Sequence, residues 1–170
     1  LFLLSEESPI KKCFQYINIF IPEMRTIIIL LFLLTAGTGA QTVCDEAEVS
    51  RIDSIKSYAE SSVINAASVT KDTDNGFTIT AYYDGNGKLL KLRAENNLSN
   101  TEQVYFENDR MCYYEISGYR SGEMFFEAWY FSGNKLFCRK NVLSGSGMKI
   151  SRKEGSKIIS KVERYLEEIQ

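Results

Sequence analysis

Aromatic side chains are the feature of this sequence that most directly indicates a binding function. Fourteen of the 21 Phe, Tyr and Trp residues fall between positions 77 and 137. In residues 123–131 they occupy odd and even positions alike, so a strand there carries aromatic rings on both faces. A strand that is apolar on both faces is either covered twice or exposes a patch of the kind that marks binding sites. We therefore predict a groove for a peptide, a lipid tail or a glycan, lined by Tyr114, Phe125, Trp129 and Phe131.

Two glutamates in the predicted strands offer a catalytic alternative. Glu115 and Glu127 both have aromatic neighbours in the sequence. A carboxylic acid buried among aromatic rings can act as a general acid, and two such groups that face one cleft can cleave a glycosidic bond. Glutamates on strands are more often solvated on a polar face, so a glycosidase-like hydrolase is the second interpretation and a non-catalytic protein the first.

The absence of histidine removes several common chemistries. Ser-His-Asp and Cys-His catalytic groups, imidazole zinc sites and the usual general base near neutral pH all need this residue. The acidic stretch at 72–76 also differs from a calcium-binding loop, because Tyr83 occupies the twelfth position, where a bidentate glutamate is needed. We predict no catalytic residue, no metal site and no cofactor.

Residues 26–34 form an apolar run that is typical of a secretory signal peptide. Met24 would be its start, Arg25 its basic region and residues 38–40 its small-residue cleavage site. A membrane-spanning helix needs about 20 apolar residues, so this run is too short, although an uncleaved amino-terminal anchor is the alternative. Residues 1–23 do not fit the secretory pattern, and we interpret them as an over-extended start. The sequence thus predicts an exported chain, periplasmic or secreted, with no stable transmembrane span after processing.

The composition describes one globular domain, which we place at 41–170. The chain has 170 residues, 44% of them hydrophobic, and its 20 Lys and Arg against 22 Asp and Glu give a formal charge of -2. A pI near 5.4 gives no broad attraction to phosphate backbones, so nucleic acid is not an expected partner. We expect a monomer that binds a protein, a peptide or a small apolar or glycan ligand.

Three cysteines follow the predicted cleavage site, and an oxidising compartment favours one disulfide and one free thiol among them. Cys112 and Cys138 lie two and three residues after the turn residues Arg110 and Lys135, which would point them to opposite faces of a sheet. This argues against a bridge between them and favours Cys44 paired with Cys138 or Cys112. The alternative is that Cys112 and Cys138 are small buried hydrophobic residues.

Two segments have the spacing of amphipathic helices. From 45 to 69 apolar residues recur every three or four positions, and the polar stretch at 70–76 is typical of a loop. Later in the chain, Ser151 and Glu154 have the spacing of a capping box, and a continuous apolar stripe runs over 158–169. We expect one face of a sheet to cover both apolar stripes.

Between these helices the hydrophobic period changes from 3.6 to 2 at Phe77. Three hairpins with short Gly, Asn or Asp turns follow, with strands predicted at 77–83, 88–94, 103–107, 110–116, 123–131 and 135–140. Connections this short require antiparallel neighbours. The sequence predicts an α+β fold with an N-terminal helix, a six-stranded antiparallel meander and a C-terminal helix packed on one face of the sheet. A strongly coiled sheet, in which both sets of aromatic rings fill one core, is the alternative to an exposed groove.

The three hairpins are similar to one another in sequence. Residues 82–90 (YYDGNGKLL), 105–112 (YFENDRMC) and 130–137 (YFSGNKLF) share an aromatic pair, a polar turn, a basic residue and then an aliphatic one, at intervals of 23 and 25 residues. The pattern resembles the MORN-variant repeats of toxin-antitoxin-associated proteins, although the middle copy lacks the glycine. That resemblance implies a binding or neutralising surface. The alternative is that any antiparallel meander with regular turns produces similar sequence segments.

These observations favour a small exported, non-catalytic binding module that uses an aromatic-rich antiparallel sheet. A hydrolase that uses Glu115 or Glu127 is the second interpretation. The third is a structural or inhibitory partner of an envelope protein, which would expose an unpaired edge strand or an apolar patch.

Overall fold

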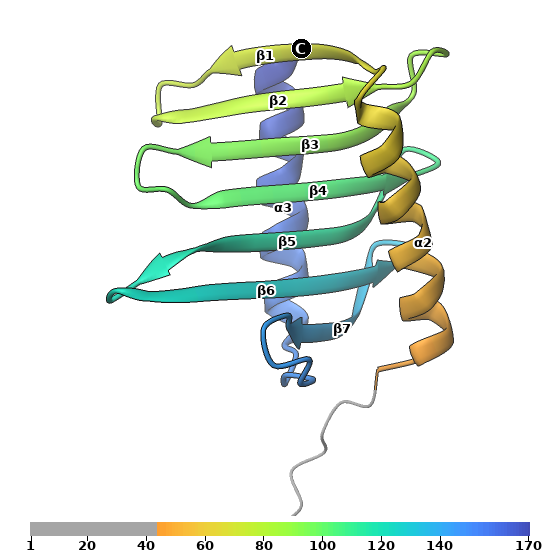
Figure 1. The fold of residues 1–170 in the computed structure, drawn as a ribbon, viewed down its shortest axis with the longest axis vertical. Helices are drawn as coiled ribbons and strands as arrows, with labels where there is room; N and C mark the ends of the chain where they lie inside the picture. The colour runs from red at the N-terminus through yellow and green to blue at the C-terminus, as the bar shows by residue number, and fades with distance from the viewer. Residues whose placement is uncertain (1–43) are drawn as a thin grey trace, which may run out of the picture. The chain divides into compact units, whose positions relative to one another are not determined.

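The computed structural model describes residues 44–170, which belong to one compact unit, Gln41–Gln170. It confirms the α+β class, with a helix, an antiparallel meander and a second helix (Figure 1). The sheet has seven strands instead of the six predicted. In chain order the elements are α2 (Glu46–Val63), β1 (Ala67–Asp72), β2 (Phe77–Tyr83), β3 (Leu89–Asn96), β4 (Thr101–Glu107), β5 (Arg110–Arg120), β6 (Glu123–Ser132), β7 (Lys135–Asn141) and α3 (Arg152–Ile169).

Tight turns join the strands, so that each pairs with its neighbours in the sequence from β1 to β7. Three of these turns have two consecutive residues with positive φ, at Asn108-Asp109, Ser121-Gly122 and Gly133-Asn134. Positive φ at both central residues is the conformation of the hairpin turns that match the natural twist of two antiparallel strands. Local turn chemistry therefore dictates the meander.

Strand β1 was not predicted from the sequence. Helix α2 ends at Val63, not near residue 69, and the chain then pairs along β2 where a loop was expected at 70–76. All six residues of β1 are exposed, so the strand has no alternation of apolar and polar residues. That alternation is the signal by which strands are recognised, and an exposed edge strand lacks it.

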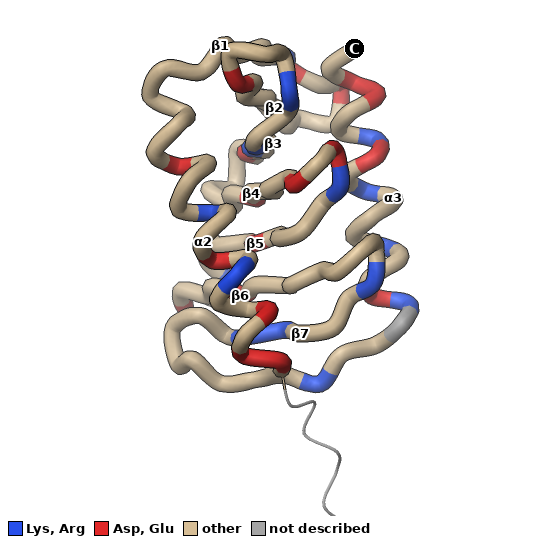
Figure 2. The backbone as a smooth tube through the Cα atoms, turned by 90° about the vertical axis from the view of Figure 1, so that its right-hand side faces the viewer, with Lys and Arg blue, Asp and Glu red and all other residues tan. Residues whose placement is uncertain are grey.

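The two helices pack on opposite faces of the sheet, whereas one shared face was expected. Helix α2 contacts β3, β4 and β5 on one face, and α3 crosses the other face, where it contacts β1, β2 and β7 (Figure 1, Figure 2). Two cores result, because successive strand residues point to opposite faces. Ile52 of α2 packs with Tyr105 and Tyr130, while Val162 of α3 packs with Trp129. The aromatic residues of both strand faces are therefore covered, each set by its own helix.

Each of the three predicted hairpins contains a β-bulge beside its turn. In all three the register shifts at the aromatic pair, and the strand after the turn holds one extra residue, namely Leu90, Cys112 or Phe137. These three residues all pack on the α2 side of the sheet, as do the residues that follow Cys112 and Phe137. A bulge interrupts the strict alternation of side chains between the two faces. A face assigned by counting residues from the turn is therefore wrong for the residues beyond the bulge. The similar segments 82–90, 105–112 and 130–137 therefore each encode a hairpin with a bulge beside its turn.

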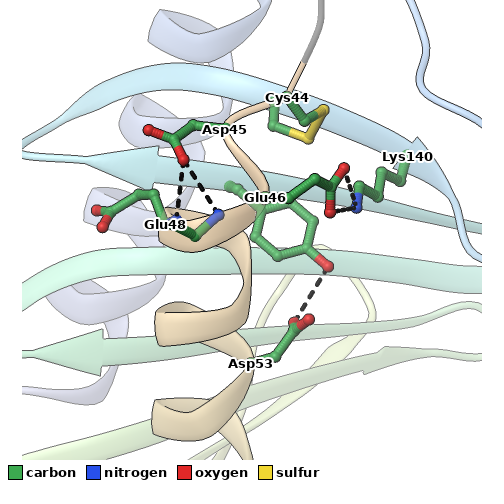
Figure 3. Close-up of a disulfide and its surroundings, with 9 residues drawn as sticks. Cys44, Asp45, Glu46, Glu48, Asp53 and Lys140 are labelled. Atoms are coloured by element: carbon green, nitrogen blue, oxygen red, sulfur yellow. Dashed lines mark hydrogen bonds and ion pairs between the residues drawn. A yellow bond between two sulfur atoms is a disulfide. The ribbon is translucent and has the colours of Figure 1, made fainter.

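The bulges place Cys112 and Cys138 on the same face of the sheet. Cys112 and Cys138 both lie on the α2 face, and the prediction that they point to opposite faces was wrong. They cannot pair because β6 separates their strands, which places them about 10 Å apart. Cys138 is bonded to Cys44, with 5.1 Å between the Cα atoms, which confirms one of the two favoured pairings (Figure 3). Cys112 is a free buried thiol, and burial raises its pKa to about 12.

Polar contacts beside the disulfide fix the beginning of α2 (Figure 3). The carboxylate of Asp45 accepts the backbone N–H groups of Ala47 and Glu48, which is the usual N-cap arrangement. Lys140 of β7 pairs with Glu46 at 3.0 Å. The first turns of α2 are thus held to the sheet by a covalent bond and by an ion pair.

Helix α3 begins without the predicted capping box. Ser151 stands at the N-cap, but its side chain accepts no backbone N–H. The carboxylate of Glu154 instead accepts Trp129 Nε1 and pairs with Arg139, each at 3.0 Å. The helix also approaches the sheet closely at Gly155, where an added Cβ would lie 2.9 Å from Leu136 Cβ. The Glu154 carboxylate, which a capping box would use at the start of the helix, binds the sheet instead.

The predicted over-extended start, signal peptide and cleavage site, at residues 1–40, lie outside the described residues. Within residues 44–170 no helix is long and apolar enough to cross a membrane. The disulfide between Cys44 and Cys138 is compatible with the oxidising compartment in which exported proteins fold.

Candidate functional site

A groove of about 600 Å³ lies between α3 and the strands β5, β6 and β7. The strands supply Tyr114, Ile116 and Arg120 from β5, Glu127 and Trp129 from β6, and Arg139 from β7. Facing them are Ser151 and the α3 residues Lys153, Glu154, Lys157, Ile158 and Lys161. The volume falls within the range of sites that bind small ligands or short segments.

The floor of the groove is apolar. Tyr114 and Trp129 are register partners on β5 and β6, and their ring centroids lie 5.3 Å apart. Both are almost fully buried, as is Ile158 of α3, whereas Ile116 is partly exposed. A ligand would therefore rest on Ile116 and on the edges of the aromatic rings, not on an open aromatic face.

The structure brings two of the four predicted aromatic residues into the groove. Tyr114 and Trp129 line it, while Phe131 is 1% exposed inside the core under α3. Phe125 lies nearer the start of β6, half-buried beneath the guanidinium of Arg120, which is 4.7 Å from the ring centroid. Because Arg120 lines the groove, Phe125 supports the rim without lining it.

Arg139 holds the first turn of α3 against the strands. Its guanidinium pairs with Glu127 and with Glu154 and lies 5.1 Å from the centroid of the Trp129 ring. The Nε atom of Arg139 is buried and makes no hydrogen bond to any other described residue. This cluster fixes one wall of the groove.

A second buried cluster fixes the middle of α3. Glu102 of β4 accepts the hydroxyl groups of Tyr114 at 2.9 Å and Tyr165 at 3.1 Å, and it pairs with Lys161. Burial is the main cause that raises the pKa of both tyrosines, and the negative charge of Glu102 is the second. Their hydroxyl groups therefore stay protonated and act as donors. Tyr114 is thereby held in the floor by its own hydroxyl.

The rim carries cations that have no acidic partner. Arg120, Lys153 and Lys157 are exposed and form no ion pair with any other residue in 44–170. In total, five basic residues and two acidic residues line the groove. The whole chain has a formal charge of -2, so the groove concentrates positive charge on an acidic protein. A cleft lined mainly by one sign of charge attracts ligands of the opposite sign.

Sequence reasoning found part of the floor but not the rim. Lys153 and Lys157 are four residues apart, which places them on one side of a helix, and this signal is present in the sequence. Arg120 lies beyond the predicted strand 110–116, and nothing in the sequence places it or Arg139 beside the second helix. These residues come together only because α3 crosses the face that carries Trp129.

The structure separates the two glutamates of the hydrolase interpretation. Glu115 faces α2, where it pairs with Lys56 at 2.6 Å and accepts the side-chain amide of Gln103 at 2.6 Å. Glu127 faces α3, where it pairs with Arg139. Carboxylates on opposite faces of a sheet cannot flank one glycosidic bond. The geometry gives this interpretation no support.

A second hollow, of about 690 Å³, lies between β1, β2 and the later turns of α3. Phe77, Ile79 and Tyr165 line it, but none of the four predicted aromatic residues does. No group of three or more Cys, Asp or Glu residues within the described part of the chain is arranged to hold a metal ion. The groove beside Trp129 is the site where predicted binding residues coincide with a distinctive charge.

Comparison of the chain with protein-family models, with curated proteins and with solved structures finds no match. The resemblance of the three hairpins to MORN-variant repeats gains no support from these comparisons. The bulge that all three hairpins share accounts for the similarity of their sequences. Function is therefore argued from the geometry of the groove.

Proposed function

We propose that the protein is a non-catalytic binding module whose ligand occupies the groove between α3 and β5, β6 and β7. The observation that carries this proposal is the lining, in which an apolar floor with Tyr114 and Trp129 lies beside five basic residues. Three of these cations have no ion-pair partner within residues 44–170, so their charge is available to a ligand. Apolar surface next to a few convergent polar groups is the usual composition of a binding site.

The fixed walls of the groove support the same proposal. Arg139 pairs with Glu154 near the start of α3, and Glu102 pairs with Lys161 and accepts the Tyr165 hydroxyl further along the same helix. These contacts hold α3 at both ends of the groove lining. A site that is already ordered loses less conformational entropy when a ligand binds. The lining side chains are therefore placed for recognition without a rearrangement of the fold.

Calorimetric titration with three chemically different probes tests this function. The probes are a glutamate-rich pentapeptide, sodium decanoate and cellotetraose. We expect one of them to bind saturably, and to bind about tenfold more weakly to an Ile116→Asn variant, because the partly exposed floor residue becomes polar. Val142→Asn is the matched control, since Val142 is an exposed β-branched residue outside the groove.

Two results would contradict the proposal. One is that no probe binds saturably to the wild-type protein. The other is that the Ile116→Asn variant, folded by circular dichroism, binds every probe as tightly as the Val142→Asn variant does. Either result would mean that the groove is not a ligand site.

The exposed edge of β1 favours a second candidate function, that of a structural or inhibitory partner of an envelope protein. β1 forms one edge of the sheet, and its outer side is unpaired within the described chain. At the opposite edge the chain folds back over β7, where Met148 N–H donates to the Arg139 carbonyl at 2.8 Å. A bare edge can accept a strand from a partner. Val69→Lys should then abolish recovery of a partner from envelope extract, and equal recovery by wild type and variant would exclude this candidate.

A further inference from the structure

The cations on the α3 wall of the groove are spaced regularly along the helix. Lys153, Lys157 and Lys161 follow one another at intervals of four residues, which places them on one side with a rise of about 6 Å per interval. Lys161 is engaged by Glu102, whereas Lys153 and Lys157 form no ion pair within the described residues. The wall therefore offers two available ammonium groups in a row, and basic positions recur along α3 in Figure 2.

The opposite wall carries one more available cation, Arg120, at the end of β5. The apolar floor lies between the two walls. Cations that are spread over both walls fit a ligand whose anionic groups are distributed along its length. A single phosphate or carboxylate would need donors that converge on one point.

An extended peptide has the spacing that the α3 wall requires. Side chains at alternate positions of an extended chain lie on the same side, about 6.6–6.8 Å apart. This distance is close to the rise of about 6 Å between Lys153 and Lys157. Acidic residues at alternate positions would therefore place one carboxylate on each lysine, while the residues between them turn toward the β5 side, where Ile116 offers apolar surface.

The floor argues against two other classes of ligand. A sugar ring stacks on an exposed aromatic face, but Trp129 is 6% exposed and the guanidinium of Arg139 lies over its ring. An acyl chain favours an apolar lining, whereas basic residues occupy both walls of this groove. Charge complementarity thus favours an acidic peptide over a glycan or a lipid tail.

We propose that the ligand of the groove is an extended segment of a partner protein with Glu or Asp at alternate positions. This inference rests on the proposed function, because it names the ligand of the same groove. Carboxylates on one side of the segment pair with Lys153 and Lys157, the residues between them contact Ile116, and Arg120 adds positive charge on the opposite wall. These pairs form near solvent, so the affinity is modest and decreases with salt.

Trp129 provides a direct measurement, since it is the single tryptophan of the chain and lines the groove. Fluorescence titrations compare the capped peptide Glu-Val-Glu-Val-Glu with its isomer Glu-Glu-Val-Val-Glu, which has the same composition and charge but no two glutamates at alternate positions. We expect the alternating peptide to bind about threefold to fivefold more tightly, as one additional exposed ion pair allows. Its affinity should decrease as the salt concentration rises from about 0.05 M to about 0.5 M.

A matched pair of charge reversals locates the effect. Lys157→Glu should weaken binding of the alternating peptide about tenfold, because a repelling charge replaces an attracting one in the groove. Lys135→Glu makes the same change at the exposed first residue of β7, outside the groove, and should leave the affinity nearly unchanged. Both variants keep Trp129, so the same signal serves for each.

The outcomes separate this inference from the function on which it rests. Equal affinity for the two isomers, or equal effects of Lys157→Glu and Lys135→Glu, would overturn the assignment of an alternating acidic segment. If decanoate or cellotetraose binds in an Ile116-dependent manner and neither peptide does, the binding function holds and this ligand assignment is wrong. If no probe produces heat or a change in Trp129 emission, both are wrong.

Discussion

Each helix is joined to the sheet by a lysine that reaches a buried glutamate. On one face Lys56 of α2 pairs with Glu115, and on the other Lys161 of α3 pairs with Glu102; both glutamates are 3% exposed. Tyrosine hydroxyl groups donate further hydrogen bonds to each carboxylate. An isolated buried carboxylate is strongly destabilising, so each pair restricts where its helix can sit on the sheet.

Removal of Lys161 should show how much its ion pair with Glu102 contributes to the free energy of unfolding. We expect Lys161→Met to lower the free energy of unfolding by about 1–3 kcal/mol, because Glu102 keeps only its two tyrosine donors. The loss should stay below that of a fully buried pair, since Lys161 is 32% exposed. Urea unfolding measures the change, and Lys157→Met, one turn earlier on α3 and exposed, is the control. Equal losses in the two variants would mean that the Lys161–Glu102 pair adds nothing to stability.

Individual site residues were predictable from the sequence only where their surroundings are local. Tyr114 and Trp129 were identified because aromatic density along a strand is visible in the sequence itself. Glu102 was not, because it precedes the predicted strand 103–107 and is buried by Tyr165, which lies 63 residues later. The role of Arg139 likewise depends on a helix that is distant in the sequence.

Among the elements, strand positions were easier to predict than strand faces. The predicted strand 123–131 corresponds to β6 (Glu123–Ser132), because alternation and turn residues are local signals. The face of Cys112 could not be read in the same way, since it is itself the extra residue of a bulge. A bulge changes which face a side chain occupies without changing the composition of the strand.

The turn between β4 and β5 should become more stable when it gains the glycine that the other two predicted hairpins contain. Asn108 and Asp109 have φ values of 51° and 61°, and Asn-Gly is a preferred pair for two positive φ angles. We expect Asp109→Gly to raise the free energy of unfolding by about 0.5–1 kcal/mol, because glycine lacks the Cβ that is crowded in this conformation. Chemical denaturation measures the gain.

Gly133→Ala supplies the opposite change at the corresponding turn between β6 and β7. Its φ is 54°, and an added Cβ would meet no atom within 4 Å, so the expected loss of about 1 kcal/mol reflects backbone conformation alone. A loss there without a gain from Asp109→Gly would show that the Asp109 side chain stabilises the turn as much as its backbone conformation costs.

In the whole molecule the sheet separates two cores, and the candidate site depends on that division. Helix α2 covers one core and is tied to β7 by a disulfide that joins residues 94 positions apart. The other face is therefore left to α3, whose first turns form a wall of the groove against β5, β6 and β7. If both helices shared one face, Trp129 and the lysines of α3 would not line a common groove. The aromatic floor was predictable from local sequence, whereas the groove required the global arrangement.

Five tyrosines pack within the two cores, and together they make stability sensitive to alkaline pH. Burial is the first cause that raises the pKa of each above its ordinary value of about 10, and neighbouring carboxylates add to it. These residues are Tyr105, Tyr113, Tyr114, Tyr130 and Tyr165. In the unfolded chain they lose protons near pH 10, whereas the folded protein retains them. Their contribution to stability is therefore complete below about pH 10 and is lost as the pH rises above that value.

We accordingly expect the free energy of unfolding to fall above about pH 10 by up to about 1.4 kcal/mol per pH unit for each of these tyrosines. The five together would remove most of the stability of a small domain, about 5–15 kcal/mol, within one or two pH units. Urea unfolding at a series of pH values measures the slope, and Tyr130→Phe should make it shallower by about 1.4 kcal/mol per unit. Phenolate absorbance of the buried tyrosines should rise together with the loss of circular dichroism. A phenolate titration that is complete while the dichroism is intact would mean that these hydroxyls ionise inside the folded cores.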